Sequence, residues 1–220
     1  MTGRRDARTD SARQGRELFT GPTPGLFLSR SDLLRRGYDF ALAAHAGQRQ
    51  ESDGSRYIDH AVAVARLLQR GGFSDEVVVA GLLHDTVERS EVEIADVERE
   101  FGSHVSSLVT AMTEPERPSD FTGRKAAHRT RIADSGGEAA AIFAADKIAL
   151  VRTLRRAVAD HGEENVGRRL GQPLDRKVEH YRKTLEMLEG RPSPPPLAQM
   201  LRRELESLDL TRSRAAVARA

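Results

Sequence analysis

Apolar side chains recur every three or four positions through most of this 220-residue chain, and no segment alternates between apolar and polar positions as a half-buried strand would. The pattern therefore predicts an all-α protein. Helices are indicated over residues 32–45, 59–69, 75–84, 93–101, 104–112, 124–133, 138–157, 175–188 and 197–208.

Side chains that cap helices support several of these starts. Ser31 and Ser74 each precede acidic residues and an apolar-periodic stretch, which is typical of an N-cap. The helix that follows Ser74 contains VVVAGLL, which is apolar on all sides up to His84, so we expect this helix at the centre of the molecule. A loop rich in Ser, Asp and Gly is predicted over residues 48–55.

Two breaks divide the chain, GPTPG at Gly21–Gly25 and RPSPPP at Arg191–Pro196. We predict a flexible, basic N-terminal arm over residues 1–27 and a compact multi-helix bundle over residues 28–190. A Pro-rich linker, a C-terminal helix and a tail are predicted over residues 191–220.

Composition narrows the class of protein. The chain has no Cys, which excludes disulfide scaffolds, thiolate zinc sites and cysteine nucleophiles, so any metal must be held by His and carboxylate. No apolar run reaches the roughly 18–20 residues that span a bilayer. The first ten residues are polar and show no secretory signal. We therefore expect a soluble, cytoplasmic protein.

Basic and acidic residues nearly balance, with 35 Lys and Arg against 33 Asp and Glu. This balance argues against nucleic acid as the principal partner, although an Arg-rich arm that binds nucleic acid is a minor alternative. Arg dominates the basic set, and the chain's four lysines are Lys125, Lys147, Lys177 and Lys183.

Candidate chemistry lies at three places: the doublet His84–Asp85, His60 before it, and Asp146 within the apolar run AAAIFAADKIAL. Two His and two Asp offer the mixed nitrogen and oxygen ligands that suit manganese, iron or zinc. Each element also has a plain structural explanation. The doublet can arise by chance, His60 can be a helix-start residue, and Asp146 can be a structural acid paired to Lys147 or Arg152.

The order of these residues resembles the HD superfamily of metal-dependent phosphohydrolases, and more narrowly the RelA/SpoT-type alarmone hydrolases. The resemblance covers about residues 30–190. The matching stretches are AHAGQ (Ala44–Gln48), YIDHAVAVARLL (Tyr57–Leu68), AGLLHDTVE (Ala80–Glu88), FGSHVSSLV (Phe101–Val109) and AADKIALVRTL (Ala144–Leu154).

The resemblance implies a ligand set of His60, His84, Asp85 and Asp146 for Mn²⁺ or another divalent cation. It implies removal of the 3′-pyrophosphate from guanosine tetra- and pentaphosphate. Glu88, one turn after His84 on the same predicted helix face, would then act on the attacking water. His45 lies in a helix motif that does not bind the metal, so we interpret it as structural.

The chain departs from the family pattern inside the substrate pocket. The family reads HDxxED, whereas this chain has Arg89 in place of the second acid, and Leu150 stands where the family has Asn. Candidate substrate contacts are Arg49, Lys147 and Tyr181.

The leading hypothesis is a metal-dependent phosphohydrolase that acts on a small phosphorylated nucleotide through an altered pocket. The alternative is a catalytically silent HD-domain module that binds a nucleotide or a partner, which Arg89 and Leu150 favour. The sequence is compatible with a homo-oligomer.

Overall fold

The computed structural model describes residues 31–115 and 120–217. Within these residues the regular secondary structure is helical, apart from one isolated bridge between Arg49 and Arg56, so the predicted all-α class is confirmed. The predicted arm over residues 1–27 lies outside the described residues. The helices are α2 (Asp32–Ala44), α3 (Tyr57–Arg70), α4 (Asp75–Leu83), α5 (Thr86–Arg89), α6 (Ile94–Met112), α7 (Phe121–Asp134), α8 (Gly137–His161), α9 (Glu163–Arg169), α10 (Leu174–Glu189) and α11 (Leu197–Val217).

Both predicted serine caps are present. The Ser31 hydroxyl accepts a hydrogen bond from Leu34 N at the start of α2, and the Ser74 hydroxyl accepts one from Val77 N at the start of α4. Each bond satisfies a backbone donor that the first helical turn leaves without a partner. The polar residues before each apolar stretch therefore set where these helices begin.

The two helices predicted over residues 93–101 and 104–112 are present as the two parts of α6, which meet at a kink. Gly102 has a φ of 85°, in the left-handed region that glycine adopts at no steric cost. The prediction of two segments is therefore right about the break.

Three elements differ from the predicted set, and one of them is the four-residue helix α5, which was not predicted. The short helix α9 was not predicted, because it is polar and buries only Val166. The last helix, α11, continues past Leu208 to Val217. Within the described part of the chain, no helix is long and apolar enough to cross a membrane.

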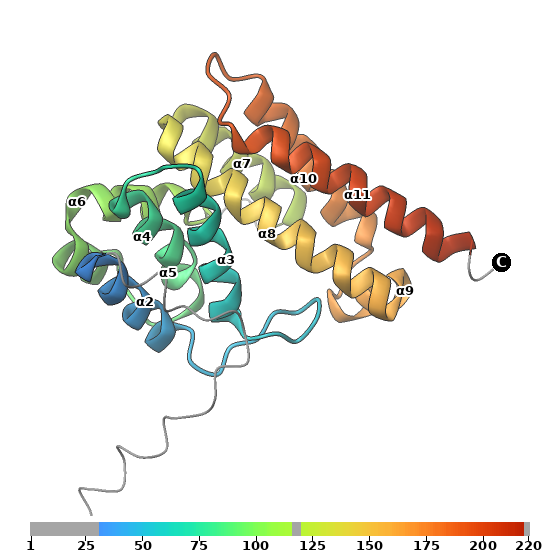
Figure 1. Ribbon diagram of the computed structural model, residues 1–220, viewed down its shortest axis with the longest axis horizontal. Helices are drawn as coiled ribbons and strands as arrows, with labels where there is room; N and C mark the ends of the chain where they lie inside the picture. Colours follow the sequence, from blue (N-terminus) through green and yellow to red (C-terminus); the bar gives the residue numbers. More distant parts are fainter. Residues whose placement is uncertain (1–30, 116–119, 218–220) are drawn as a thin grey trace, which may run out of the picture.

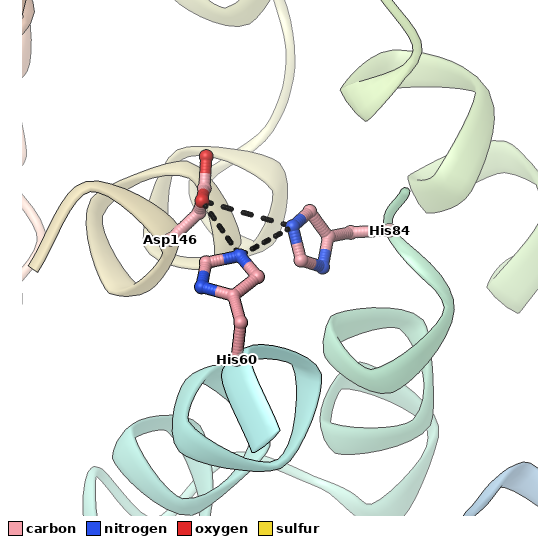
Figure 2. A group of neighbouring side chains, drawn as sticks. All are labelled: His60, His84 and Asp146. Carbon is pink, nitrogen blue, oxygen red and sulfur yellow. Dashed lines mark hydrogen bonds and ion pairs between the residues drawn. The ribbon is translucent and has the colours of Figure 1, made fainter. Parts of the chain in front are cut away.

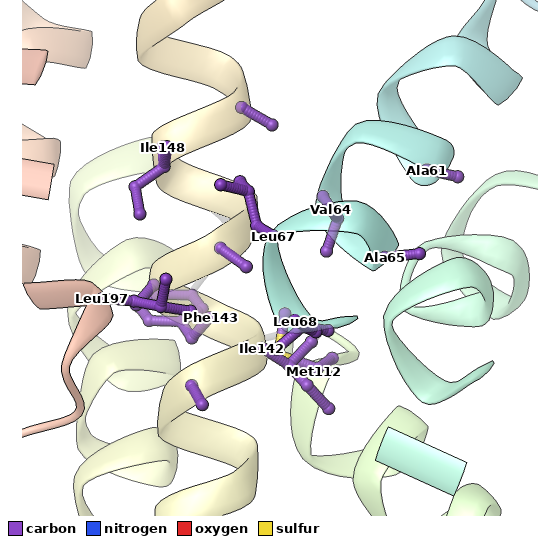
Figure 3. Close-up of a cluster of buried hydrophobic side chains, with 14 of the residues drawn as sticks. Ala61, Val64, Ala65, Leu67, Leu68, Met112, Ile142, Phe143, Ile148 and Leu197 are labelled. Carbon is purple, nitrogen blue, oxygen red and sulfur yellow. The ribbon is translucent and has the colours of Figure 1, made fainter. Parts of the chain in front are cut away.

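The long helix α8 lies at the centre of the molecule, with α3 and α4 on one side and α11 along the other (Figure 1). Its apolar residues face both neighbours. Ile142 lies near Leu68 and Met112, while Phe143 lies beside Leu197 at the start of α11 (Figure 3). The hydrophobic core therefore runs continuously from α3 through α8 to α11.

Helix α4 is buried along the whole stretch Val77–Leu83, as its all-round apolar pattern predicted. It approaches α3 closely at Gly81, where an added Cβ would lie only 2.4 Å from Leu68 Cδ1. This packing holds the end of α4, and with it His84, deep inside the bundle.

Candidate metal centre and its adjoining cavity

Three buried side chains from three helices converge at one point: His60 on α3, His84 at the end of α4, and Asp146 on α8 (Figure 2). Their Nε2, Nε2 and Oδ1 atoms lie between 3.2 and 3.7 Å apart. Ligand atoms about 2.1 Å from one cation are separated by roughly 3.0–3.5 Å. The spacing therefore suits a single shared divalent ion.

The protonation of His84 also suits a metal. Its Nδ1 lies 2.9 Å from Gly81 O, and because a carbonyl oxygen only accepts, Nδ1 carries the proton. The other nitrogen, Nε2, points at the cluster and is the atom that can offer a lone pair to a cation. A second hydrogen bond of this kind fixes the ring of a metal-ligating histidine.

Asp146 supplies a charged ligand atom to the cluster. Burial opposes its charge, but Lys147 and the imidazoles of His60 and His84 outweigh burial and hold the pKa of Asp146 well below its ordinary value. Its other oxygen, Oδ2, accepts from Lys147 Nζ. The structural pairing with Lys147 is thus present alongside the cluster, whereas Arg152 pairs with Glu204 of α11 instead.

Asp85 lies at the edge of the cluster. Its Oδ2 is 3.2 Å from His84 Nε2, and it accepts a hydrogen bond from the Tyr57 hydroxyl. Arg89 Nε lies 3.7 Å from the same oxygen, and the Arg89 guanidinium stacks over the Tyr57 ring at 4.6 Å. Asp85 can therefore reach a cation next to His84, while Tyr57 and Arg89 hold it in place.

His45 is buried next to this group. Its Nδ1 is 3.0 Å from Gln48 Oε1, and its ring packs against Tyr57 with centroids 4.8 Å apart. It is absent from the converging set of ligand atoms. Its contacts agree with the structural interpretation.

A cavity opens beside the cluster at Asp85 and Asp146, and we call it the metal-side cavity. Asp85 and Asp146 form part of its wall. All of the predicted substrate contacts, Arg49, Lys147 and Tyr181, line it. The fold therefore gathers residues from the loop 48–55, α8 and α10 into one space.

Glu88 also lines the metal-side cavity, but the helix that was expected to carry it from His84 is interrupted. Helix α4 ends at Leu83, where Thr86 Oγ1 donates to Leu83 O, and the short helix α5 begins at Thr86. Partial desolvation raises the pKa of Glu88, and the negative charge of Asp85 raises it further. Its carboxylate accepts a hydrogen bond from Glu114 N.

Two basic residues of the cavity were missed from the sequence, Lys125 on α7 and Lys177 on α10. One signal could have found them. The chain contains only four lysines, and three of them, Lys125, Lys147 and Lys177, line this one cavity. Arg89 and Leu150, the two departures from the family pattern, line it as well.

The HD domain family matches residues 37–163, more than half of the chain. This chain belongs to the HD domain family. The matched region of this HD domain contains the three converging side chains and both departures from the expected pattern.

Relatives of this HD domain carry names that describe alarmone hydrolysis. The chain is 34% identical over 140 residues to the human guanosine-3′,5′-bis(diphosphate) 3′-pyrophosphohydrolase MESH1, covering 62% of this chain and 78% of that protein. It is 30% identical to the Xenopus tropicalis protein of the same name, covering 74% and 92%.

Other similar proteins are much longer. The chain is 37% identical to a GTP pyrophosphokinase of Streptomyces coelicolor over a stretch that makes up 46% of this chain and only 12% of that protein.

Among solved structures, lmo0812 from Listeria monocytogenes shares 33% identity at a TM-score of 0.61, covering 67% of this chain and 96% of that one. The structure titled a metazoan ortholog of SpoT shares the fold, with a TM-score of 0.64 and 23% identity over 83% of this chain and 96% of its own.

Proposed function

We propose that this HD domain is a metal-dependent phosphohydrolase that removes the 3′-pyrophosphate from guanosine tetra- or pentaphosphate, with Mn²⁺ as its metal. One observation carries the proposal. The ligand atoms of His60, His84 and Asp146 converge, and Asp146 also lines a cavity whose basic side chains come from five separate segments. The names of the MESH1 relatives support this choice of substrate.

The charges of the metal-side cavity fit a phosphorylated substrate only when a cation is present. Five basic side chains line the cavity, and five acidic ones, including Asp85 and Asp146, balance them. A divalent ion held by the acids would leave the space with a net positive charge. Binding of the substrate's phosphates should therefore depend on the metal.

The lysines favour a ligand that carries several negative charges. Burial lowers the pKa of Lys177; Glu51 opposes this shift, and the nearby charges of Lys125, Lys147 and Arg89 lower the pKa further. These cations therefore repel one another in a partly dehydrated space. A pyrophosphate group placed among them would relieve that repulsion.

In the proposed reaction, water adds to the phosphorus of the 3′-pyrophosphate and the bond to the ribose 3′ oxygen breaks, which yields pyrophosphate and a nucleoside diphosphate from the tetraphosphate. A bound cation supplies Lewis-acid polarisation at that phosphate. We assign Asp85 as a fourth ligand beside His84 and Glu88 as the acceptor of the water's proton. Lys147, Arg49 and Tyr181 hold the substrate in the cavity.

The direct test is pyrophosphate release from guanosine tetraphosphate by the Mn²⁺-loaded protein. Asp85→Ala is the matched blank. We expect release by the wild type and its loss in the blank, with the same circular dichroism spectrum for both. Equal release by both proteins would contradict the proposed site.

The alternative is a catalytically silent module that binds a nucleotide or partner, and the position of Arg89 favours it. Arg89 occupies the place of the family's second acid, and its guanidinium rests on Tyr57 and pairs with Asp85 at the cavity wall. A cation there offers no acceptor for a proton. The variant Arg89→Asp discriminates between the two functions. If the variant gains hydrolysis that the metal-loaded wild type lacks, the wild type is the silent module.

A further inference from the structure

A second hollow lies between α3 and α8, and we call it the α3–α8 groove. It shares only one lining residue, Gln50, with the metal-side cavity. Helix α8 turns different faces to the two spaces. Asp146 and Leu150 face the cavity, whereas Ala149 and Arg156 face the groove. The groove is therefore a separate site on the same pair of helices.

Arginines gather on both walls of the α3–α8 groove. Arg66 and Arg70 come from α3, one turn apart, and three more come from α8. Three aspartates also line the groove, so basic side chains outnumber acidic ones. The five arginines are Arg66, Arg70, Arg152, Arg155 and Arg156.

Two of the three aspartates of the groove already have partners, while Asp160 lies on α8 one turn after Arg156. Asp53 accepts hydrogen bonds from the backbone and hydroxyl of Ser55, and Asp59 pairs with Arg56. Among the residues that the structure describes, neither Arg70 nor Arg156 has a carboxylate partner. With five arginines against three aspartates, the lining of the groove carries an excess of positive charge.

One arginine donor of the groove is also unsatisfied. The Nε atom of Arg155 is buried and has no hydrogen-bond partner in the described structure, although another nitrogen of its guanidinium lies 3.6 Å from Glu204. Leaving such a donor unpaired costs about 1–3 kcal/mol.

The floor between the arginines is aliphatic, with Val62, Ala63 and Leu67 from α3 and Ala149 and Ala157 from α8. Guanidinium groups bind phosphate oxygens through paired donors, and an aliphatic floor accepts the flat face of a base or a sugar edge. The two features together match a ligand that has both a phosphate chain and an apolar part.

We propose that the α3–α8 groove binds an oligophosphate ligand, of the nucleoside di- or triphosphate class, at a site distinct from the metal-side cavity. Arg70 and Arg156, from opposite walls, hold the phosphate chain. The groove also reaches the back of the metal cluster, since His60 lines it. The proposal concerns binding and does not depend on hydrolysis in the cavity.

The test is isothermal titration of the full-length, Mn²⁺-loaded chain with inorganic tripolyphosphate and, separately, with GTP. We expect two binding events with each probe. The double variant Arg70→Glu/Arg156→Glu should weaken one event at least tenfold, and Lys125→Ala should weaken the other. Tighter binding of GTP than of tripolyphosphate at the groove identifies a nucleotide, and equal binding identifies an inorganic oligophosphate.

Arg99→Glu is the matched control, because Arg99 is an exposed arginine on α6 that lines neither space. It should keep both events. A single binding event that is abolished by Lys125→Ala, or two events that persist unchanged in the groove variant, would overturn the proposal. Circular dichroism spectra of the variants establish that any loss is not a loss of fold.

Discussion

Lysine is scarce in this chain, so the position of each lysine is informative. Three line the metal-side cavity, while Lys183 lies outside it on α10 and pairs with Glu179. Lysine carries a compact point charge on a flexible stem, which lets several of them approach one phosphate chain from different helices. The three lysines of the cavity are therefore the candidates for contacts with the substrate's phosphates, and Lys183 is not.

Lys177→Ala tests this separation. We expect the variant to raise KM for guanosine tetraphosphate roughly tenfold, because a charge-assisted contact contributes about 1.5–3 kcal/mol. Lys183→Ala, a change of the same size on the same helix, should leave KM unchanged. Steady-state kinetics with Mn²⁺ measures both, and equal KM values for the two variants would remove Lys177 from the substrate site.

At the scale of elements, the contact between α3 and α4 positions two of the candidate ligands. His60 and His84 are carried by these helices, and Leu68 packs between them against Gly81. Any loosening of this contact would separate the imidazoles. Packing and the metal site are therefore coupled.

Leu68→Ala should lower the free energy of unfolding by about 2–5 kcal/mol, since Leu68 is fully buried. Leu42→Ala is the control, because Leu42 is 41% exposed and its loss should cost less than about 0.5 kcal/mol. Urea unfolding followed by circular dichroism gives both values. Similar costs for the two substitutions would show that the α3–α4 contact is not tightly packed.

The end of α6 is tied to α7 by Glu114, which contacts Lys125 and lies 3.9 Å from His128. Burial opposes its charge, but His128 and Lys125 outweigh burial and lower the pKa of Glu114 to about 2. A carboxylate with a depressed pKa stabilises the fold above its ordinary pKa near 4.5, and this stability is lost as the pH falls toward 2.

Glu114→Gln should therefore cost on the order of 1–3 kcal/mol at neutral pH and much less near pH 2. Unfolding free energies measured across this range check the prediction. Glu98→Gln, an exposed acid on α6, should cost little at any pH. A penalty for Glu114→Gln that does not change with pH would show that its charge is unimportant.

At the scale of the whole molecule, α11 packs along α8 and completes the core. Leu201 and Leu208 are fully buried, and Glu204 pairs with Arg152 of α8. The boundary proposed after residue 190 stays a prediction, but the hydrophobic core extends across it.

A chain that ends at Gly190 should fail to fold stably. It would expose several buried leucines that contribute roughly 2 kcal/mol each, which together approach the total stability of a typical domain. Thermal melts and size-exclusion chromatography measure the effect. A chain that ends at Val217 is the control and should melt like the full chain. If the shorter chain melted cooperatively at the wild-type temperature, α11 would not be needed for a stable core.

The apolar pattern predicted most of the fold because helix period and capping are local properties. The caps at Ser31 and Ser74 and the break at Gly102 follow from neighbouring residues. The short helix α9 was not predicted because its one buried residue, Val166, gives no periodic pattern. Contacts of α9 with α8 and α10 appear only in the folded chain.

Local chemistry and a family resemblance pointed to His60, His84 and Asp146, because a histidine or aspartate within an apolar run needs a reason to be buried. The convergence of their ligand atoms depends on contacts between helices that are distant in sequence, so local patterns could not predict it. The sequence also did not predict that Lys125 and Lys177 line one cavity. The two residues lie on different helices, α7 and α10, and come together only in the folded chain.

The sequence by itself determined the helical class, the helix starts and the residue types available for a metal, because these depend on periodicity, capping and the absence of cysteine. The tertiary structure alone decided which basic side chains line the metal-side cavity and which arginines line the α3–α8 groove. It also decided that Asp85 accepts a hydrogen bond from Tyr57 and pairs with Arg89. These features depend on how helix faces meet, and a helix's own periodicity does not specify its neighbour.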